Sequence, residues 1–145
     1  MTAVAISNAM NTHIDAALIL WNRDVIELFS LVLEQRNLKS CGVEPSEGHE
    51  RIEDFIVSCD PSVVVFDLDP PYDRSAAIAL QLLDRFPDRS YVITCADSAR
   101  AIKAAPWLCC HPVFQKPYAM DEIANTVRAM VRRSCRNTVA MAIGM

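Results

Sequence analysis

Short apolar runs alternate along the chain with segments in which apolar residues recur every three or four positions. The run from Ala16 to Trp21 has the length of a β-strand. After Asp24, apolar residues return at helical spacing up to about Asn37, which predicts an amphipathic helix. The clearest strand covers residues 62–67. Its β-branched residues follow one another without alternation, as in a central parallel strand that is covered on both faces.

The same alternation predicts the remaining elements. They are strands at 38–43, 91–94 and 113–115, and helices at about 52–59, 76–83, 98–105 and 120–135. Five strand–helix units in series predict an α/β fold, a doubly wound five-stranded parallel sheet with helices on both sides. We expect residues 1–13 to form an N-terminal extension, residues 14–136 a single domain, and residues 137–145 a short C-terminal tail.

The composition is that of a globular domain, with 52% apolar and 22% charged residues among 145. A net charge of −4 leaves no basic field to attract phosphates, so no nucleic acid is expected as a partner. No apolar stretch approaches the roughly 20 residues of a membrane span, and we expect a cytoplasmic protein without membrane contact. The six cysteines form no C-x-x-C pair and are expected to be buried thiols in a reducing compartment.

Three polar residues stand at the predicted carboxyl ends of the third, fourth and fifth strands, and they are Asp67, Thr94 and Lys116. Working residues of parallel α/β sheets gather at this edge. A carboxylate, a hydroxyl and an ammonium group that converge there fit phosphoryl chemistry. The carboxylate can attack phosphorus while the other two groups bind the equatorial oxygens. Taken singly, a strand-end Asp is more often a helix cap, and a Lys-Pro pair more often a turn.

The order of these residues resembles that in receiver domains of bacterial response regulators, over about residues 15 to 135. The matching segments are Val63–Pro71, Tyr91–Ala96 and Phe114–Tyr118. The resemblance implies a flavodoxin-like receiver fold, with Asp67 as the residue phosphorylated by a histidine kinase. It implies further that Thr94 is the switch hydroxyl and that Lys116, followed by Pro117, pairs with the phosphoryl group.

One departure from the receiver pattern concerns the metal. Receivers end the first strand with two acidic residues that hold Mg²⁺, whereas this chain has Trp21-Asn22-Arg23 there. Each lost carboxylate removes an attraction on the order of 4 kcal/mol per unit charge at 4 Å, before desolvation is subtracted. Hard Mg²⁺ prefers carboxylate oxygens. We therefore expect at most a weak Mg²⁺ site, for which the candidate ligands are Asp67, Asp69, Asn22 and Asp24.

A second departure concerns the switch. Three residues before Lys116, where receivers carry an aromatic residue, this chain has Val113. Valine cannot move between buried and exposed positions while carrying a polar tip, as tyrosine does. We also expect Trp21 to lie beside the site, and Lys116 to form a resting ion pair with Asp67, because a buried charge without a partner is costly.

These observations favour a stand-alone receiver-like signalling domain of a two-component or phosphorelay system, in which Mg²⁺-dependent phosphorylation of Asp67 is weakened or lost. A fully active phosphoacceptor receiver stays open as the alternative. Phe66-Asp67-Leu68-Asp69 also resembles the D-x-D motif of haloacid-dehalogenase-like phosphatases, but that motif continues with Gly-Thr, where this chain has Pro70-Pro71. The chain is therefore not expected to be an enzyme.

The segment after the last predicted helix is too short for an output domain, so we expect the signal to leave through protein contacts. A sensor histidine kinase or a phosphotransfer protein is the upstream partner that the resemblance implies. For output we expect a protein partner or self-association through the face built by the fourth helix, the fifth strand and the last helix. Trp107, Tyr118 and the arginines of the last helix are assigned to this face. Those arginines also fit the dipole of a helix C-terminus.

Overall fold

The computed structural model describes residues 13–45 and 49–142, with side chains described up to Ser134. Most of the predicted N-terminal extension and the last residues of the predicted tail therefore lie outside the described residues. Within them, five strands alternate with helices along the chain. The strands are β1 (Ala16–Ile19), β2 (Ser40–Val43), β3 (Val63–Leu68), β4 (Ser90–Cys95) and β5 (Val113–Gln115).

The helices connect successive strands, and a final helix follows the last strand. They are α2 (Arg23–Glu34), α3 (His49–Cys59), α4 (Tyr72–Arg85), α5 (Ser98–Ala104), the 3₁₀ helix η2 (Pro106–Cys110) and α6 (Met120–Ala142). None of the described helices is both long and apolar enough to cross a membrane.

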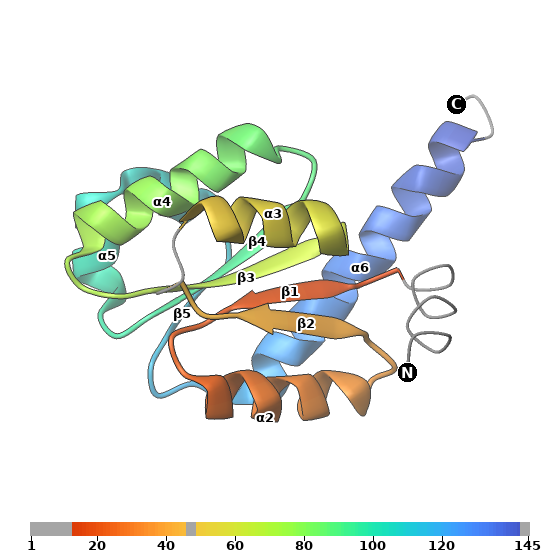
Figure 1. The fold of residues 1–145 in the computed structure, drawn as a ribbon, viewed down its shortest axis with the longest axis horizontal. Helices are drawn as coiled ribbons and strands as arrows, with labels where there is room; N and C mark the ends of the chain where they lie inside the picture. The colour runs from red at the N-terminus through yellow and green to blue at the C-terminus, as the bar shows by residue number, and fades with distance from the viewer. Residues whose placement is uncertain (1–12, 46–48, 143–145) are drawn as a thin grey trace.

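All strands pair in parallel in the order β2-β1-β3-β4-β5. The helices α3, α4 and α5 cover one face of the sheet and α2 and α6 the other (Figure 1). This confirms the predicted doubly wound five-stranded fold. The order reverses between β1 and β3, and ligands of such sheets bind near this point at the carboxyl ends of the strands.

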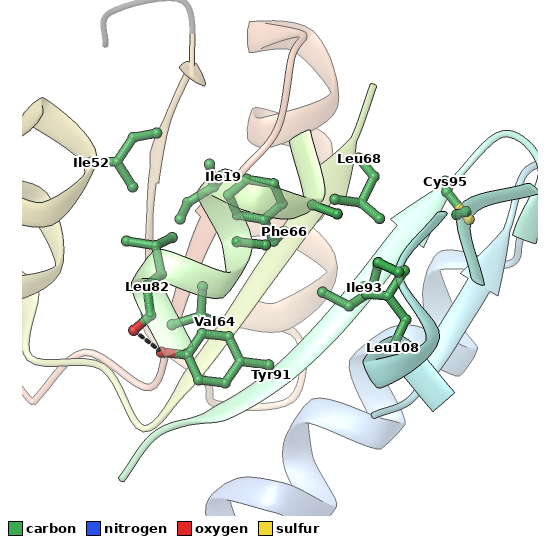
Figure 2. Packing of buried hydrophobic residues seen from close by; sticks show 14 of the residues in the cluster. Ile19, Ile52, Val64, Phe66, Leu68, Leu82, Tyr91, Ile93, Cys95 and Leu108 are labelled. Atoms are coloured by element: carbon green, nitrogen blue, oxygen red, sulfur yellow. Dashed lines mark hydrogen bonds between the residues drawn. The ribbon is translucent and has the colours of Figure 1, made fainter. Parts of the chain in front are cut away.

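Strict alternation of side chains along β3 divides the core into two layers. Val64 and Phe66 pack with α3 and α4 on one face, while Val63 and Val65 pack with α2 and α6 on the other. Figure 2 shows the first layer, in which the Tyr91 hydroxyl group donates to the main-chain oxygen of Leu82. Because β3 is buried along its whole length, its apolar run lacks the polar alternation of a strand with one solvent face.

Two parts of the secondary structure differ from the sequence prediction. The last helix continues to Ala142 instead of ending near residue 135, and its C-terminal part extends beyond the sheet (Figure 1). The segment 137–142 contains no proline or glycine that would end the helix. The 3₁₀ helix at Pro106–Cys110 was not predicted, because its single turn is too short to show a period.

Candidate functional site

The three predicted strand-end residues meet at one edge of the sheet. Asp67 follows Val63 and Val65 at two-residue steps, so its side chain points to the α2 and α6 side. Thr94 is the register partner of Asp67 on β4 and points the same way. Lys116 comes directly after β5, and its main-chain N–H donates to the main-chain oxygen of Cys95 over 2.9 Å. The parallel pairing therefore brings a carboxylate, a hydroxyl and an ammonium group together.

Both oxygens of the Asp67 carboxylate have partners from the protein. Thr94 Oγ1 donates to Asp67 Oδ1 over 2.6 Å, and Lys116 Nζ lies 3.1 Å from each of the two carboxylate oxygens. Asp67 is only 5% exposed and Thr94 is fully buried, whereas the side chain of Lys116 is 45% exposed. The ion pair predicted between Lys116 and Asp67 is confirmed. It neutralises a carboxylate that would otherwise be buried without compensation.

Trp21 closes the site from the end of β1. Its indole Nε1 donates to the main-chain oxygen of Asp67 over 3.0 Å, and its ring is 39% exposed. Together with Asp67, Lys116 and Tyr118, the ring lines a cavity of about 320 Å³ whose remaining walls are mostly apolar. The prediction that Trp21 lies beside the site is confirmed. A large apolar ring therefore forms one wall of the cavity beside Asp67.

Among the other candidate metal ligands, Asn22 lines the same cavity as Asp67, but its side-chain oxygen already accepts hydrogen bonds. Asn22 is the N-cap of α2, and its Oδ1 accepts from the main-chain N–H groups of Asp24 and Val25 over 2.8 and 3.4 Å. The carboxylate of Asp24 is exposed in the first turn of that helix. Asp69 lines a separate hollow with Trp21, Pro70 and Pro71. Neither carboxylate thus lines the cavity of Asp67 among the described residues.

The described residues do not fit a Mg²⁺ ion held as receivers hold it. In the part of the chain that the structure describes, no three His, Cys, Asp or Glu residues come close enough to share a metal. The single carboxylate at the site already has Thr94 and Lys116 as partners. An ammonium group at this distance from the carboxylate also opposes a second cation.

Tyr118 is a member of the site that sequence reasoning assigned elsewhere. Burial raises the pKa of its hydroxyl group, the charge of Asp67 adds to this, and a hydrogen bond with Thr94 acts in the opposite direction. The hydroxyl group therefore stays protonated at neutral pH. Thr94, which donates to Asp67, is therefore also the neighbour of the Tyr118 hydroxyl group.

The sequence places Tyr118 on the outer face of α5, β5 and α6, and this assignment is wrong. Its ring packs on Phe29 of α2, with the ring centroids 6.0 Å apart, and belongs to the layer between the sheet and α2 and α6. Sequence periodicity gives no signal for this position, because Tyr118 lies in the loop between β5 and α6. By contrast, Val113 is partly buried on the opposite layer, against α5 and η2.

The arginines of α6 do not lie near its C-terminus, so the explanation through the helix dipole is wrong. The helix runs to Ala142 and has no basic residue in its last turn. Arg132 and Arg133 are exposed in the middle of the helix, and Arg128 is half-buried. The side chain of Arg136, which belongs to the same sequence cluster, lies outside the described residues.

The site contains the groups needed for an attack of Asp67 on a phosphoryl group. In this structure, however, Thr94 and Lys116 are bound to the carboxylate, and the charge of Lys116 balances that of Asp67. Thr94 and Lys116 are the donors that would meet the oxygens of a phosphoryl group, and both already contact the carboxylate. Access from solvent leads through the cavity beside Trp21.

Comparisons by sequence identify no relatives, since no model of a protein family matches the chain and no curated protein sequence matches it significantly. Solved structures do match. The receiver domain of a putative LuxO repressor protein from Vibrio parahaemolyticus superposes with a TM-score of 0.71 and 15% identity, over 89% of this chain and 98% of that one.

Two further structures give the same result. A two-component transcriptional regulator AraC from Clostridium phytofermentans matches with a TM-score of 0.68 and 12% identity, over 88% of this chain and 98% of that one. The apo receiver domain of nitrogen regulatory protein C matches with a TM-score of 0.66 and 16% identity, over 83% and 96%. At such low identity the likeness establishes the fold alone, and that fold is the one found in response-regulator receiver domains.

Proposed function

We propose that this chain is a receiver-like signalling domain of a two-component or phosphorelay system, which works through protein–protein contacts and in which Mg²⁺-dependent phosphorylation of Asp67 is weakened or lost. The fold and the meeting of Asp67, Thr94 and Lys116 at the switch point of the sheet support the receiver assignment. The upstream partner that fits such a domain is a sensor histidine kinase or a phosphotransfer protein.

Weakened phosphorylation is supported by the Asp67 carboxylate beside Trp21, because both of its oxygens already contact other side chains. Asp67 has partners on both oxygens, and the chain carries Trp21 after β1, where the receiver pattern has an acidic residue. A metal ion would have to bind beside one carboxylate, against the nearby charge of Lys116. Each missing carboxylate removes a gross attraction on the order of 4 kcal/mol per unit charge at 4 Å.

The alternative, a fully active phosphoacceptor, is favoured by the same three residues being in place. The two functions differ in what happens when Mg²⁺ and a small phosphodonor such as acetyl phosphate are supplied. We expect the wild-type chain to bind Mg²⁺ at least tenfold more weakly than a variant in which one acidic ligand is restored, Trp21→Asp. We also expect little phosphoryl addition at Asp67 by intact-mass spectrometry, and no steady hydrolysis of phosphomonoesters.

Fluorescence of Trp21 reports Mg²⁺ binding in the wild-type chain, and calorimetry reports it in Trp21→Asp. Asp67→Asn is the control that removes the acceptor in both backgrounds. Sub-millimolar Mg²⁺ binding and stoichiometric phosphorylation of the wild-type chain, both lost in Asp67→Asn, would establish the fully active receiver instead. Steady phosphatase turnover that depends on Asp67 and Asp69 would overturn both receiver functions.

For output we propose the outer surface of α5, β5 and α6, with Trp107 and the exposed arginines Arg132 and Arg133 as its anchors. Trp107 is half-buried at the end of the α5–η2 segment, where its ring meets His111 edge-on at 5.9 Å between centroids. Aromatic and arginine side chains are the residue types most often found at the centres of protein interfaces. We propose no nucleic acid and no membrane as partner.

A further inference from the structure

Two cysteines lie on facing surfaces of β2 and α3, away from the Asp67 site. Gly42 points to α2, because a Cβ atom on it would overlap Cγ2 of Ile26. Side chains alternate along a strand, so the neighbours of Gly42, Cys41 and Val43, point to the opposite face, which α3 covers. Val43 indeed packs with Ile52 of α3 in one core layer.

Cys59 lies on the stripe of α3 that faces the sheet. It follows the fully buried residues Ile52 and Ile56 by seven and three positions, which is helical spacing for one face. The helix runs back along the strand that precedes it, so its last residue, Cys59, lies at the same end of the layer as Cys41 near the start of β2. Cα atoms of the two elements approach within 8 Å.

The two thiols also act on each other chemically. A hydrogen bond from Cys59 lowers the pKa of Cys41 to about 7, against the opposing effect of its burial. The same bond, with burial, raises the pKa of Cys59. Arg51 and Asp54 of α3 line the neighbouring hollow but are not among the causes of these shifts. Cys41 is therefore the thiol of the pair that loses its proton more readily and becomes the nucleophilic thiolate, while Cys59 holds its proton more strongly.

Small molecules can reach this pair. Both thiols are half-buried and not enclosed, and β2 is the edge strand of the sheet. A hollow of about 320 Å³ lies next to the pair along the contact of β2 and α3, although neither cysteine lines it; its walls are Val43, Arg51, Asp54, Phe55 and Ser58. The expectation that the cysteines are buried thiols therefore fails here, as it does for the exposed Cys109 and Cys110. Among the described cysteines only Cys95 is buried.

We propose that Cys41 and Cys59 are a redox-active pair, which a hydroperoxide converts reversibly into a disulfide that joins β2 to the C-terminal end of α3. The Cys41 thiolate attacks one oxygen of hydrogen peroxide and the O–O bond breaks. Cys41 becomes a sulfenic acid, and the departing hydroxide takes a proton to become water. The Cys59 sulfur then attacks the Cys41 sulfur, the S–O bond breaks, and a second water leaves with the Cys59 proton. Two thiols are oxidised and one peroxide is reduced.

Peptide mapping of the full chain tests the pair directly. Trypsin cuts after Lys39, Arg51 and Arg74, so Cys41 and Cys59 fall into different peptides, residues 40–51 and 52–74, each with a single cysteine. After stoichiometric hydrogen peroxide and blocking of free thiols, we expect these two peptides to be joined by a disulfide. Dithiothreitol should separate them. The variant with Cys109→Ala and Cys110→Ala is the matched control and should give the same joined peptides.

The rate at which iodoacetamide alkylates Cys41 at pH 7 tests separately whether Cys59 donates a hydrogen bond to Cys41. Cys59→Ala removes this hydrogen bond, so the Cys41 pKa returns toward its ordinary value and less of Cys41 is thiolate at pH 7. The higher nucleophilicity of a more basic thiolate offsets only part of this loss, so we expect slower alkylation of Cys41 in the variant than in the wild-type chain. Peroxide-treated wild-type chain in which Cys41 stays free, or is joined only to cysteines other than Cys59, would overturn the proposal.

Discussion

At the scale of single residues, Asp67 and Lys116 form the charge pair on which the site depends. Lys116→Ala leaves Asp67 with Thr94 as its one remaining side-chain partner, and the charge stays almost buried. Loss of one partner from a fully buried pair costs about 3 to 5 kcal/mol. Because the Lys116 side chain is 45% exposed, water compensates part of this loss, and we expect the free energy of unfolding to fall by about 1 to 3 kcal/mol.

Chemical denaturation of Lys116→Ala measures this change. Lys103→Ala on α5 is the matched control, since Lys103 is exposed and its replacement should change the stability by less than about 0.5 kcal/mol. Equal stability of Lys116→Ala and Lys103→Ala would mean that the ion pair contributes nothing to the fold.

Tyr91 gives the fold a predictable dependence on alkaline pH. Its buried hydroxyl group lies 3.0 and 2.8 Å from the main-chain oxygens of Leu82 and Phe86, and burial raises its pKa to about 12. The folded pKa exceeds the unfolded value near 10, so the stabilisation is fully present below pH 10 and is lost as the pH rises toward 12. We expect Tyr91→Phe to be about 1 kcal/mol less stable at pH 7 and to lose less stability between pH 10 and 12. Parallel pH profiles of the two proteins would contradict this.

The positions of Asp67, Thr94 and Lys116 were predictable because parallel strands end at one edge of the sheet. The partners of Trp21 and Tyr118 were not, because they depend on the path of the loops that carry these rings. For Asn22, the sequence does contain a signal for its role as a helix cap. An Asn directly before an amphipathic helix is a preferred N-cap, and here its oxygen serves the helix instead of a metal.

At the scale of elements, Gly42 sets how closely α2 packs on β2. A Cβ atom at this position would overlap Cγ2 of Ile26, which is itself buried against the sheet. Gly42→Ala should therefore cost about 1 to 3 kcal/mol of stability through overpacking, measured by denaturation. Ile26→Leu removes the methyl branch, so the double variant should recover part of the loss. Additive effects in this mutant cycle would show that the two side chains do not collide.

Element types were predictable from the sequence, and element ends less so. The helix at Tyr72–Arg85 begins four residues before its first strongly apolar stretch, because Pro71 serves as its N-cap and the first turn carries Asp73 and Arg74. Likewise, α6 passes residue 135 and continues through the uncharged segment 137–142, where hydrophobic periodicity gives no stop signal. Apolar periodicity identifies the buried part of a helix, whereas its ends are set by caps and breakers.

At the scale of the whole molecule, the Asp67 site and the part of the proposed output surface around Trp107 lie on different sides of β5. Thr94 and Tyr118 belong to the side of α2 and α6, whereas Val113 and the Trp107 part of the output surface pack against the α5 layer. A receiver that signals through an aromatic switch needs a side chain that moves between these surroundings. Val113 is short and apolar, so the described residues offer no such side chain at this position. A change at Asp67 would therefore have little effect on the surface around Trp107.

Binding through that surface should accordingly depend on Trp107 and be indifferent to phosphodonor. Measured as self-association by sedimentation, or as capture of a purified partner, it should weaken about thirtyfold in Trp107→Ala, since interface anchors contribute about 2 kcal/mol or more.

Because Trp107 also packs on the core, Arg132→Glu on the exposed face of α6 serves as a second test that spares the fold. Leu31→Ala, an exposed apolar residue on α2, is the matched control and should leave binding unchanged. Binding that strengthens only with acetyl phosphate, and is lost in Asp67→Ala, would instead show that the site and this surface are coupled through a working phospho-switch.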